Sequence, residues 1–287
     1  MKNALLTFGS AAAILLGLST QLAGCACEQQ TQEDGSTLTV CEPITIYEGE
    51  PVTDTLLYAP GKGLEADIAN GSLTVRVGGG DEVSVTWRPK TGHGRGEEDL
   101  ARQEMEEGLT FTLEERGDMI YVQSAVAAGK SPYLGADVEI TLPSGFAGAV
   151  DIFKENAGDV DADLRGSTPT STRVSANGSL RVLGAQGTLD IAQTAGLSCE
   201  VSVTGWSANS GKIACDDAAD ITIASGLGGI LTAVSQRGVV NDPSPFPSDW
   251  VAAEGNVENS KTFSFGDSTG AGTVAVTSDE DVNLSVN

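Results

Sequence analysis

The stretch Gly158-Asp-Val-Asp-Ala-Asp-Leu164, together with the later Gly178-Ser-Leu-Arg-Val-Leu183, decides the fold. Each segment begins with a turn glycine and then alternates apolar residues with polar ones, as a strand with one buried face does. The two glycines are 20 residues apart, and Gly211 and Gly229 nearly repeat this spacing. A period of about 20 residues fits one coil of a β-solenoid, although a β-sandwich with a strand every ~8–12 residues remains the alternative.

Similar short strands follow throughout residues 143–287, which we therefore expect to be solenoid-like repeats. Further examples are Gly187-Thr-Leu-Asp-Ile191, Val201-Ser-Val203, Gly211-Lys-Ile-Ala214, Asp220-Ile-Thr-Ile-Ala224 and Gly229-Ile-Leu-Thr-Ala-Val234. The run from Asn241 to Trp250 contains three prolines and predicts a surface loop that Phe246 and Trp250 pin to the body. A final coil ending at Asn287 would leave a sheet edge open, so we expect that the chain can self-associate.

Residues 52–142 show a different pattern, which predicts an antiparallel meander ahead of the repeats. Alternating apolar residues at 64–68 and 73–77 flank Asn70-Gly71, a dipeptide typical of a β-hairpin turn. Pro143 ends the last strand of this region. One short helix is expected over residues 97–107, with Leu100 and Met105 as weak apolar anchors. The fold class is therefore all-β, with a β-strand-repeat domain of residues 52–287. In this domain a short antiparallel entry region, residues 52–142, precedes the β-solenoid repeats of residues 143–287.

The first 25 residues end in Leu22-Ala23-Gly24-Cys25. Lys2 precedes an apolar, charge-free run from Ala4 to Leu18, which has the length and flanks of a secretory signal peptide. The tetrapeptide resembles the lipobox of bacterial lipoproteins, in which the cysteine is acylated and the chain is cut before it. By that resemblance residues 1–24 are the signal peptide and Cys25 carries the lipid, such as palmitate. A plain signal peptide with a chance cysteine is the alternative.

This resemblance implies that the chain is exported and held at a membrane surface by its lipid. Ala26, which follows Cys25, is not the aspartate that usually retains lipoproteins at the inner membrane. In a Gram-negative cell, the resemblance therefore points to the outer membrane. Residues 25–51, which are mostly polar over 26–40, are expected to form the lipidated start and a short tether.

The charge of the chain is strongly acidic. Without residues 1–24 it keeps 15 lysines and arginines against 40 acidic residues, a net charge of −25. Such a chain repels nucleic acid and anionic headgroups, which excludes nucleic acid as a partner, and it attracts cations. Solubility alone is the simpler explanation of this charge.

Four cysteines remain besides Cys25, and three disulfide connectivities are open to them. Sequence distance favours Cys27 with Cys41 and Cys199 with Cys215, in a compartment where disulfides persist. We expect Cys199 and Cys215 to point inward on neighbouring strands. A disulfide that closes a loop of this size stabilises the folded protein by roughly 3 kcal/mol. A zinc site is disfavoured because the sequence has no Cys-x-x-Cys and only one histidine, His93.

Several motifs resemble a known family. They are Gly71-Ser-Leu-Thr-Val-Arg-Val, Ile140-Thr-Leu-Pro143, Gly158-Asp-Val-Asp-Ala and Gly178-Ser-Leu-Arg-Val. Together they resemble a bacterial β-solenoid family of envelope proteins, a domain of unknown function related to auto-transporter adhesin head domains. The likeness covers about residues 60–287 and implies a β-solenoid without established catalysis. The family has no functional residues to carry over.

Asp159, Asp161 and Asp163 are the candidate metal ligands, because on a strand they would share one outward face. Such carboxylates could hold calcium, but the glycine and the closing glutamate of an EF-hand loop are missing, and a solvated acidic face is favoured. His93 has no evident partner and is expected to be a mobile surface residue. Among the tryptophans, Trp206 is the best candidate for a sugar platform, yet packing is favoured.

The function expected from these observations is a non-catalytic, lipid-anchored envelope protein that presents a rigid acidic surface for adhesion, binding or a structural role. Its expected partners are the membrane, through the lipid on Cys25, and envelope or surface proteins or glycans. The alternative is a calcium-dependent carbohydrate-active enzyme on a β-helix scaffold. Paired carboxylates such as Asp216-Asp217 exist, but nothing in the sequence places them across a cleft.

Overall fold

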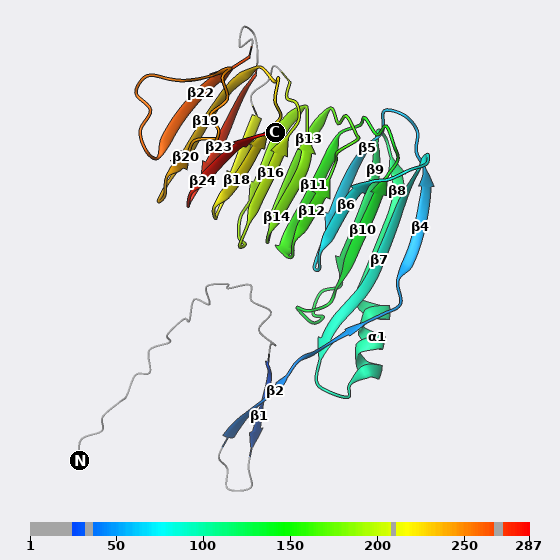
Figure 1. Ribbon diagram of the computed structural model, residues 1–287. Helices are drawn as coiled ribbons and strands as arrows, with labels where there is room; N and C mark the ends of the chain where they lie inside the picture. The colour runs from blue at the N-terminus through cyan, green and yellow to red at the C-terminus, as the bar shows by residue number, and fades with distance from the viewer. Residues whose placement is uncertain (1–24, 32–36, 208–210, 267–271) are drawn as a thin grey trace, which may run out of the picture.

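The computed structural model describes residues 25–31, 37–207, 211–266 and 272–287. These residues form an all-β body of two 11-stranded mixed sheets, a separate two-stranded hairpin and one helix (Figure 1). The hairpin consists of β1 (Cys25–Thr31) and β2 (Thr37–Pro43), and the helix is α1 (Glu98–Gly108). The predicted signal peptide, residues 1–24, lies outside the described residues.

In both large sheets the hydrogen-bonded order of the strands differs from their order in the chain. The first sheet runs β20 (Val240–Asn241), β24 (Val282–Val286), β18 (Ala219–Ile223), β16 (Cys199–Val203), β14 (Leu180–Ala185), β12 (Val160–Asp163), β6 (Leu73–Val77), β10 (Gly135–Leu142), β7 (Glu82–His93) and β3 (Thr45–Glu48), with β4 (Val52–Leu57) also paired to β7. The second sheet runs β21 (Trp250–Ala252), β22 (Ser260–Phe265), β19 (Gly229–Ser235), β23 (Thr273–Ser278), β17 (Gly211–Cys215), β15 (Thr188–Gln193), β13 (Ser171–Asn177), β11 (Val150–Ala157), β5 (Gly63–Ile68), β9 (Met119–Val126) and β8 (Leu109–Arg116).

From β9 to β20 the chain alternates between the two sheets, placing one strand in each. Each strand from β11 to β16 pairs in parallel with the strand two positions later in the chain. One pass through both sheets therefore forms one coil, and successive coils stack side by side. This parallel pairing explains the glycine spacing of the sequence, because each coil repeats the turns of the coil before it.

The core lies between the sheets and is built from rows of inward side chains in matching register. The residues of two such rows are buried: Val75, Ala162, Val182, Val201, Ile221 and Leu284 in the first sheet, and Ala66, Ile152, Val174, Ile191, Ile213 and Val276 in the second. The predicted period-2 alternation is thus confirmed. Burying each larger aliphatic side chain contributes about 1.5–3 kcal/mol, so the rows supply much of the stability of the stack.

Glycines form a column at one corner of the coils. A Cβ atom at Gly158 would lie 1.9 Å from the carbonyl oxygen of Gly71, and one at Gly178 would lie 2.2 Å from that of Gly158. The turn backbones of adjacent coils approach too closely here for any side chain. Gly158 and Gly178 are therefore required by coil-to-coil contact at this corner.

A buried lysine lies beneath this column. The Lys154 side chain from β11 is 1% exposed, and its Nζ donates hydrogen bonds to the carbonyl oxygens of Ala69, Asn156 and Ala157 at 2.5, 3.1 and 3.4 Å. These bonds compensate part of the cost of burying an ammonium group. Lys154 thereby ties the turn after β5 to the end of β11.

The antiparallel meander predicted over residues 52–142 is wrong in one part. The Asn70-Gly71 turn does not close a hairpin, because β5 and β6 lie in different sheets and pair in parallel with β9 and β11, and with β10 and β12, respectively. Asn70 instead donates a hydrogen bond to the carbonyl oxygen of Leu134. Antiparallel pairing in this region joins β7 to β3, β4 and β10, and β8 to β9. β5 and β6 have parallel partners, so parallel pairing begins well before residue 143.

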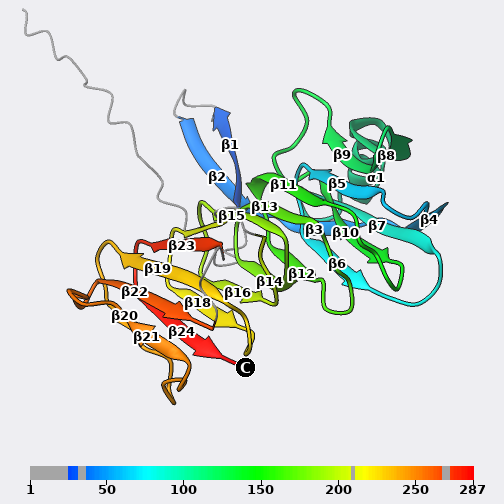
Figure 2. The ribbon, with the colours of Figure 1, turned by 90° about the horizontal axis from the view of Figure 1, so that it is seen from above.

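The expectation of an open final coil at Asn287 is also wrong. β23 lies between β17 and β19, and β24 lies between β18 and β20, so the last coil is inserted inside the stack. The two edges at this end are β20 and β21, and β21 and β22 pair antiparallel. Figure 2 shows these strands and α1 at opposite ends of the body.

The helix predicted over residues 97–107 is confirmed as α1 (Glu98–Gly108). Its expected anchor Leu100 is 54% exposed, however, whereas Ala101 is fully buried. Within the described residues, no helix is long and apolar enough to cross a membrane.

Candidate functional site

Cys25 is the first residue of β1, opposite Pro43 in the register of the β1–β2 hairpin. The same register sets Cys27 opposite Cys41. Residues directly opposite in an antiparallel pair have Cα atoms roughly 4.5–5.5 Å apart, which is within the range that a disulfide spans. The backbone is thus compatible with the Cys27–Cys41 disulfide, which stays a prediction, as does the lipid on Cys25.

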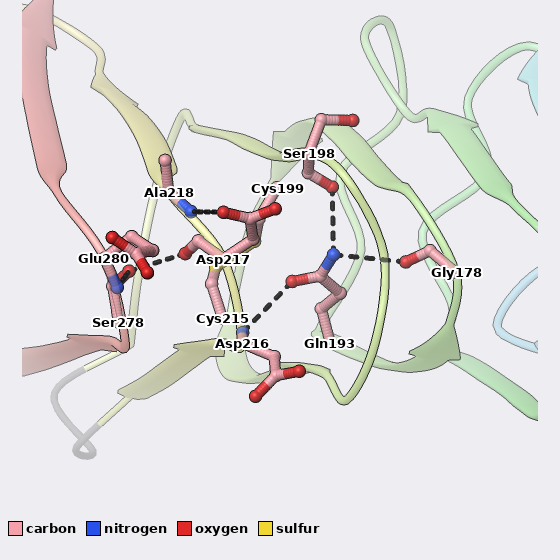
Figure 3. Close-up of a disulfide and its surroundings, with 10 residues drawn as sticks. All are labelled: Gly178, Gln193, Ser198, Cys199, Cys215, Asp216, Asp217, Ala218, Ser278 and Glu280. Carbon is pink, nitrogen blue, oxygen red and sulfur yellow. Dashed lines mark hydrogen bonds between the residues drawn. A yellow bond between two sulfur atoms is a disulfide. The ribbon is translucent and has the colours of Figure 1, made fainter. Parts of the chain in front are cut away.

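The predicted disulfide between Cys199 and Cys215 is confirmed (Figure 3). Both residues are buried, and their Cα atoms are 6.1 Å apart. The expectation of neighbouring strands is corrected, because Cys199 lies on β16 in the first sheet and Cys215 on β17 in the second. Inward-pointing residues of the two sheets face each other, so the bond links the sheets through the core.

Gln193 joins three turns next to this disulfide. Figure 3 shows its amide nitrogen donating to the carbonyl oxygens of Gly178 and Ser198, while its amide oxygen accepts from the backbone nitrogen of Asp216, at 3.1–3.2 Å. The side chain is 3% exposed. Buried polar groups whose hydrogen bonds are all formed favour one strand register over others, so Gln193 fixes the relative positions of these three turns.

The three candidate calcium ligands engage different partners. Asp161 lies between Arg76 and Arg181, at 3.5 and 3.2 Å, and Asp163 pairs with Arg165. Asp159 precedes β12, and its carboxylate accepts a hydrogen bond from the backbone nitrogen of Ser179. Across the described residues, no group of three or more His, Cys, Asp or Glu side chains could hold a metal ion. This geometry is that of a solvated, partly paired acidic face.

Ladders of charge run across the outer faces of both sheets. Arg181 bridges Asp161 and Glu200 on the first sheet, and Arg173 bridges Asp151 and Asp190 on the second. The first row continues as an amide ladder, in which Asn241 donates to Asn283 and Asn283 donates to Asp220, at 2.8 and 2.9 Å. Each exposed ion pair contributes only about 0–1 kcal/mol, so the ladders mainly order the side chains of a polar surface.

The tryptophans pack against other rings, as favoured from the sequence. Trp87 stacks on Phe111 with ring centroids 4.0 Å apart. Trp206 meets Phe265 edge-on at 5.5 Å, and Trp250, which is 6% exposed, stacks on the same ring at 4.4 Å. The predicted pinning of the 241–250 loop by Trp250 is therefore confirmed. Phe246 is 44% exposed, and its ring centroid is 6.1 Å from that of Phe263.

The expectation that His93 is a mobile surface residue is wrong. Its Nε2 is 2.7 Å from Oε2 of Glu104 on α1, a side chain that also accepts hydrogen bonds from Thr91 Oγ1 and the Ser131 backbone nitrogen. Burial raises the pKa of Glu104, but the hydrogen bonds from Ser131, Thr91 and His93 outweigh it and hold that pKa below its ordinary value. No local motif reveals this cluster, because helix docking brings its members together.

The acidic turns considered for glycosidase chemistry have structural roles instead. Asp217 accepts a hydrogen bond from the Ala218 nitrogen, and Asp281 accepts one from the Val239 nitrogen. Arg237 pairs with both Asp279 and Glu280. These carboxylates therefore stabilise turns, whereas a glycosidase needs two of them facing each other across a cleft.

Comparisons with known proteins add little to this geometry. No family model and no curated protein match the chain. Among solved structures, it is similar to a "putative cell adhesion protein" from Clostridium sporogenes, with 14% identity, a TM-score of 0.47, and coverage of 83% of this chain and 100% of that one. A "putative adhesin" from Bacteroides fragilis gives 8% identity, a TM-score of 0.31, and coverage of 83% and 97%. Because both TM-scores lie below 0.5, these likenesses carry no weight for fold or function.

Proposed function

We propose that this chain is a non-catalytic lipoprotein of a bacterial cell envelope, anchored by a lipid on Cys25. The observation that carries the proposal is the tetrapeptide Leu22-Ala23-Gly24-Cys25 behind a charge-free apolar run. Cys25 also begins the β1–β2 hairpin, which forms its own two-stranded sheet ahead of β3 (Thr45–Glu48), the first strand of the body. This hairpin acts as the spacer between the membrane and the body, and in a cell with two membranes the anchor is in the outer one.

The body itself is a two-sheet β-solenoid in this proposal. The strand-by-strand alternation between sheets, the parallel pairing from β11 to β18 and the glycine column at one corner support it. A stack of this kind is rigid because each coil is hydrogen-bonded to its neighbours. Its outer faces are polar and are ordered by the charge ladders.

The body displays this acidic surface to other envelope or surface proteins or to glycans, in adhesion, in binding or in a structural role. The chain has a formal net charge of −24, which disfavours nucleic acids and anionic headgroups as partners and favours cationic ones. Binding by display requires a stiff frame and an anchor, and it requires no catalytic group.

The anchor is tested with a pair of cysteine variants, in bacteria that express the full chain and are fed an alkyne analogue of palmitate. The wild-type chain and Cys27→Ser should be labelled and found in the membrane fraction. Cys25→Ser, two positions away, should be neither labelled nor membrane-bound. Label retained in Cys25→Ser, or a soluble wild-type chain, would contradict the anchor.

A further inference from the structure

A groove opens at the end of the body that carries the helix. It lies between α1 and the segment from β3 to the start of β4, next to β7, and has a volume of about 670 Å³. Tyr47, Val52, Pro89 and Met105 supply its apolar lining. This volume is within the range of roughly 300–1,000 Å³ that is typical of ligand sites.

Both walls of the groove are held in place by contacts within the protein. On the strand side, the Gly49 backbone nitrogen donates to the carbonyl oxygen of Pro89, and a Cβ at Gly49 would lie 2.8 Å from the Pro89 ring. On the helix side, Ala101 is fully buried and Glu104 is held by His93. The groove is therefore preformed, so a ligand need not pay for ordering it.

The charged residues that line the groove are mostly acidic. Glu48, Glu50, Glu98 and Glu106 line it, against a single Arg102. Glu48 pairs with Arg88 and Arg102 with Asp99, whereas no basic side chain among the described residues pairs with the other three glutamates. A ligand that fits both the lining and the charge is cationic and also carries an apolar side chain.

The length of the groove sets the size of this ligand. Glu98 and Glu106 lie eight positions apart on α1, which corresponds to about 12 Å along the helix axis. An extended peptide advances about 3.3–3.6 Å per residue, so three or four residues span that distance.

We propose that this groove binds a short basic segment of another protein. An apolar side chain of the segment contacts Tyr47, Val52 and Met105, and its lysines or arginines lie beside Glu50, Glu98 and Glu106. The inference rests on the display function proposed above and names the chemistry of one partner. It is independent of the lipid, because no groove residue lies in residues 1–43.

The experiment uses the full chain labelled with ¹³C at the methionine methyl groups. The three methionines are Met1, Met105 and Met119, and only Met105 lines the groove. The probes are acetyl-Lys-Leu-Lys-Leu-Lys-amide and its counterpart with glutamate in place of lysine. We expect the basic peptide to shift the Met105 resonance in a saturable manner and to leave Met119 unmoved, while the acidic peptide shifts neither.

Two triple variants separate groove binding from general charge attraction. Glu50→Gln/Glu98→Gln/Glu106→Gln should weaken the affinity for the basic peptide about ten-fold. Asp249→Asn/Glu254→Gln/Glu258→Gln removes the same charge from exposed positions near β21 and β22, at the opposite end of the body, and should leave the affinity unchanged. Equal weakening by both variants, or a static Met105 resonance, would overturn the proposal. Either result leaves the Cys25 labelling experiment unaffected, so failure of the groove and failure of the anchor are distinguishable.

Discussion

The middle of the stack and its two ends protect their strands differently. Every strand from β13 to β16 has two parallel neighbours, which are the strands two positions before it and two positions after it in the chain. At each end, one coil is taken out of chain order, β5 with β6 at one end and β23 with β24 at the other. A long exposed parallel edge would offer a template for another chain. Antiparallel strands form three of the four sheet edges, β3, β8 and β21, and the fourth edge strand, β20, pairs in parallel with β24 but is only two residues long.

The two ends also differ in chemistry. The end with α1 combines the stack of Trp87 on Phe111 with polar contacts, among them the His93 and Glu104 pair, and it leaves an acidic groove. The end with β21 is held by aromatic packing of Trp250 on Phe263 and Phe265. An end with an acidic groove is suited to binding a partner, whereas an end packed with aromatic rings is suited to closing the stack. This difference agrees with the partner site proposed above.

The largest effect is expected where the inserted coil lies inside the stack. Val276 on β23 is fully buried, so Val276→Asp should destabilise the protein by about 5 kcal/mol or unfold it, because an unpaired charge enters the core. The matched change Val251→Asp, at a position 64% exposed on the edge strand β21, should cost about 0.5 kcal/mol or less. Urea unfolding measures both, and similar costs would contradict the inserted coil.

Next in size is the aromatic end. Trp250→Ala removes a ring stacked on Phe265 and should cost about 3–5 kcal/mol. Phe246→Ala, at a half-exposed ring in the same loop, should cost about 1 kcal/mol. Thermal unfolding of both variants compares them, and a larger loss for Phe246→Ala would mean that another residue closes this end.

The glycine column tests the middle of the stack. Gly178→Ala should cost about 2–3 kcal/mol, because the new Cβ would lie 2.2 Å from a carbonyl oxygen of the adjacent coil. Gly79→Ala has no atom within 4 Å of its Cβ and should be neutral. A neutral Gly178→Ala in chemical denaturation would show that the coils are not packed this closely.

The smallest effect, counted per pH unit, is a dependence of stability on pH. Burial and the positive charge of Lys90 together lower the pKa of Lys154 to about 8, although Asp137, Asp159 and Asp67 oppose the shift. Between that value and the ordinary 10.5, the unfolded state binds more protons than the folded state, so the free energy of unfolding rises with pH. Relative to Lys154→Met, the wild type should gain up to about 1.4 kcal/mol per pH unit in this window. A flat difference would contradict the lowered pKa.

The sequence predicts the strands of the middle and the helix, because alternation and turn glycines are local signals. It predicts the pairing of Cys199 with Cys215, although the two residues come from opposite sheets. It does not predict where the inserted coils lie in the sheets. The strands β5, β6, β23 and β24 would show the same alternation of apolar and polar residues whichever strands they paired with. Asn70-Gly71 likewise has the same local sequence whether it forms a hairpin turn or a corner between the two sheets, so the sequence does not distinguish them.

The groove and the His93 cluster could not be predicted for a different reason. Their residues come from β3, β7 and α1, which are separated in sequence and meet only when the helix docks. The alternation of the sequence predicts that the side chains of the candidate ligands Asp159, Asp161 and Asp163 point outward. The arginines that pair with Asp161 come from neighbouring coils and depend on the register.

Hydrogen exchange of the native protein, followed residue by residue, tests the difference between the middle and the ends most directly. If β23 and β24 lie inside the stack, their amides should be protected as strongly as those of β17 and β18, although β24 ends one residue before the last residue of the chain. The edge strands β20 and β21 should exchange much faster. Rapid exchange in β24, as in a fraying final coil, would contradict the inserted coil and with it the closed end of the body.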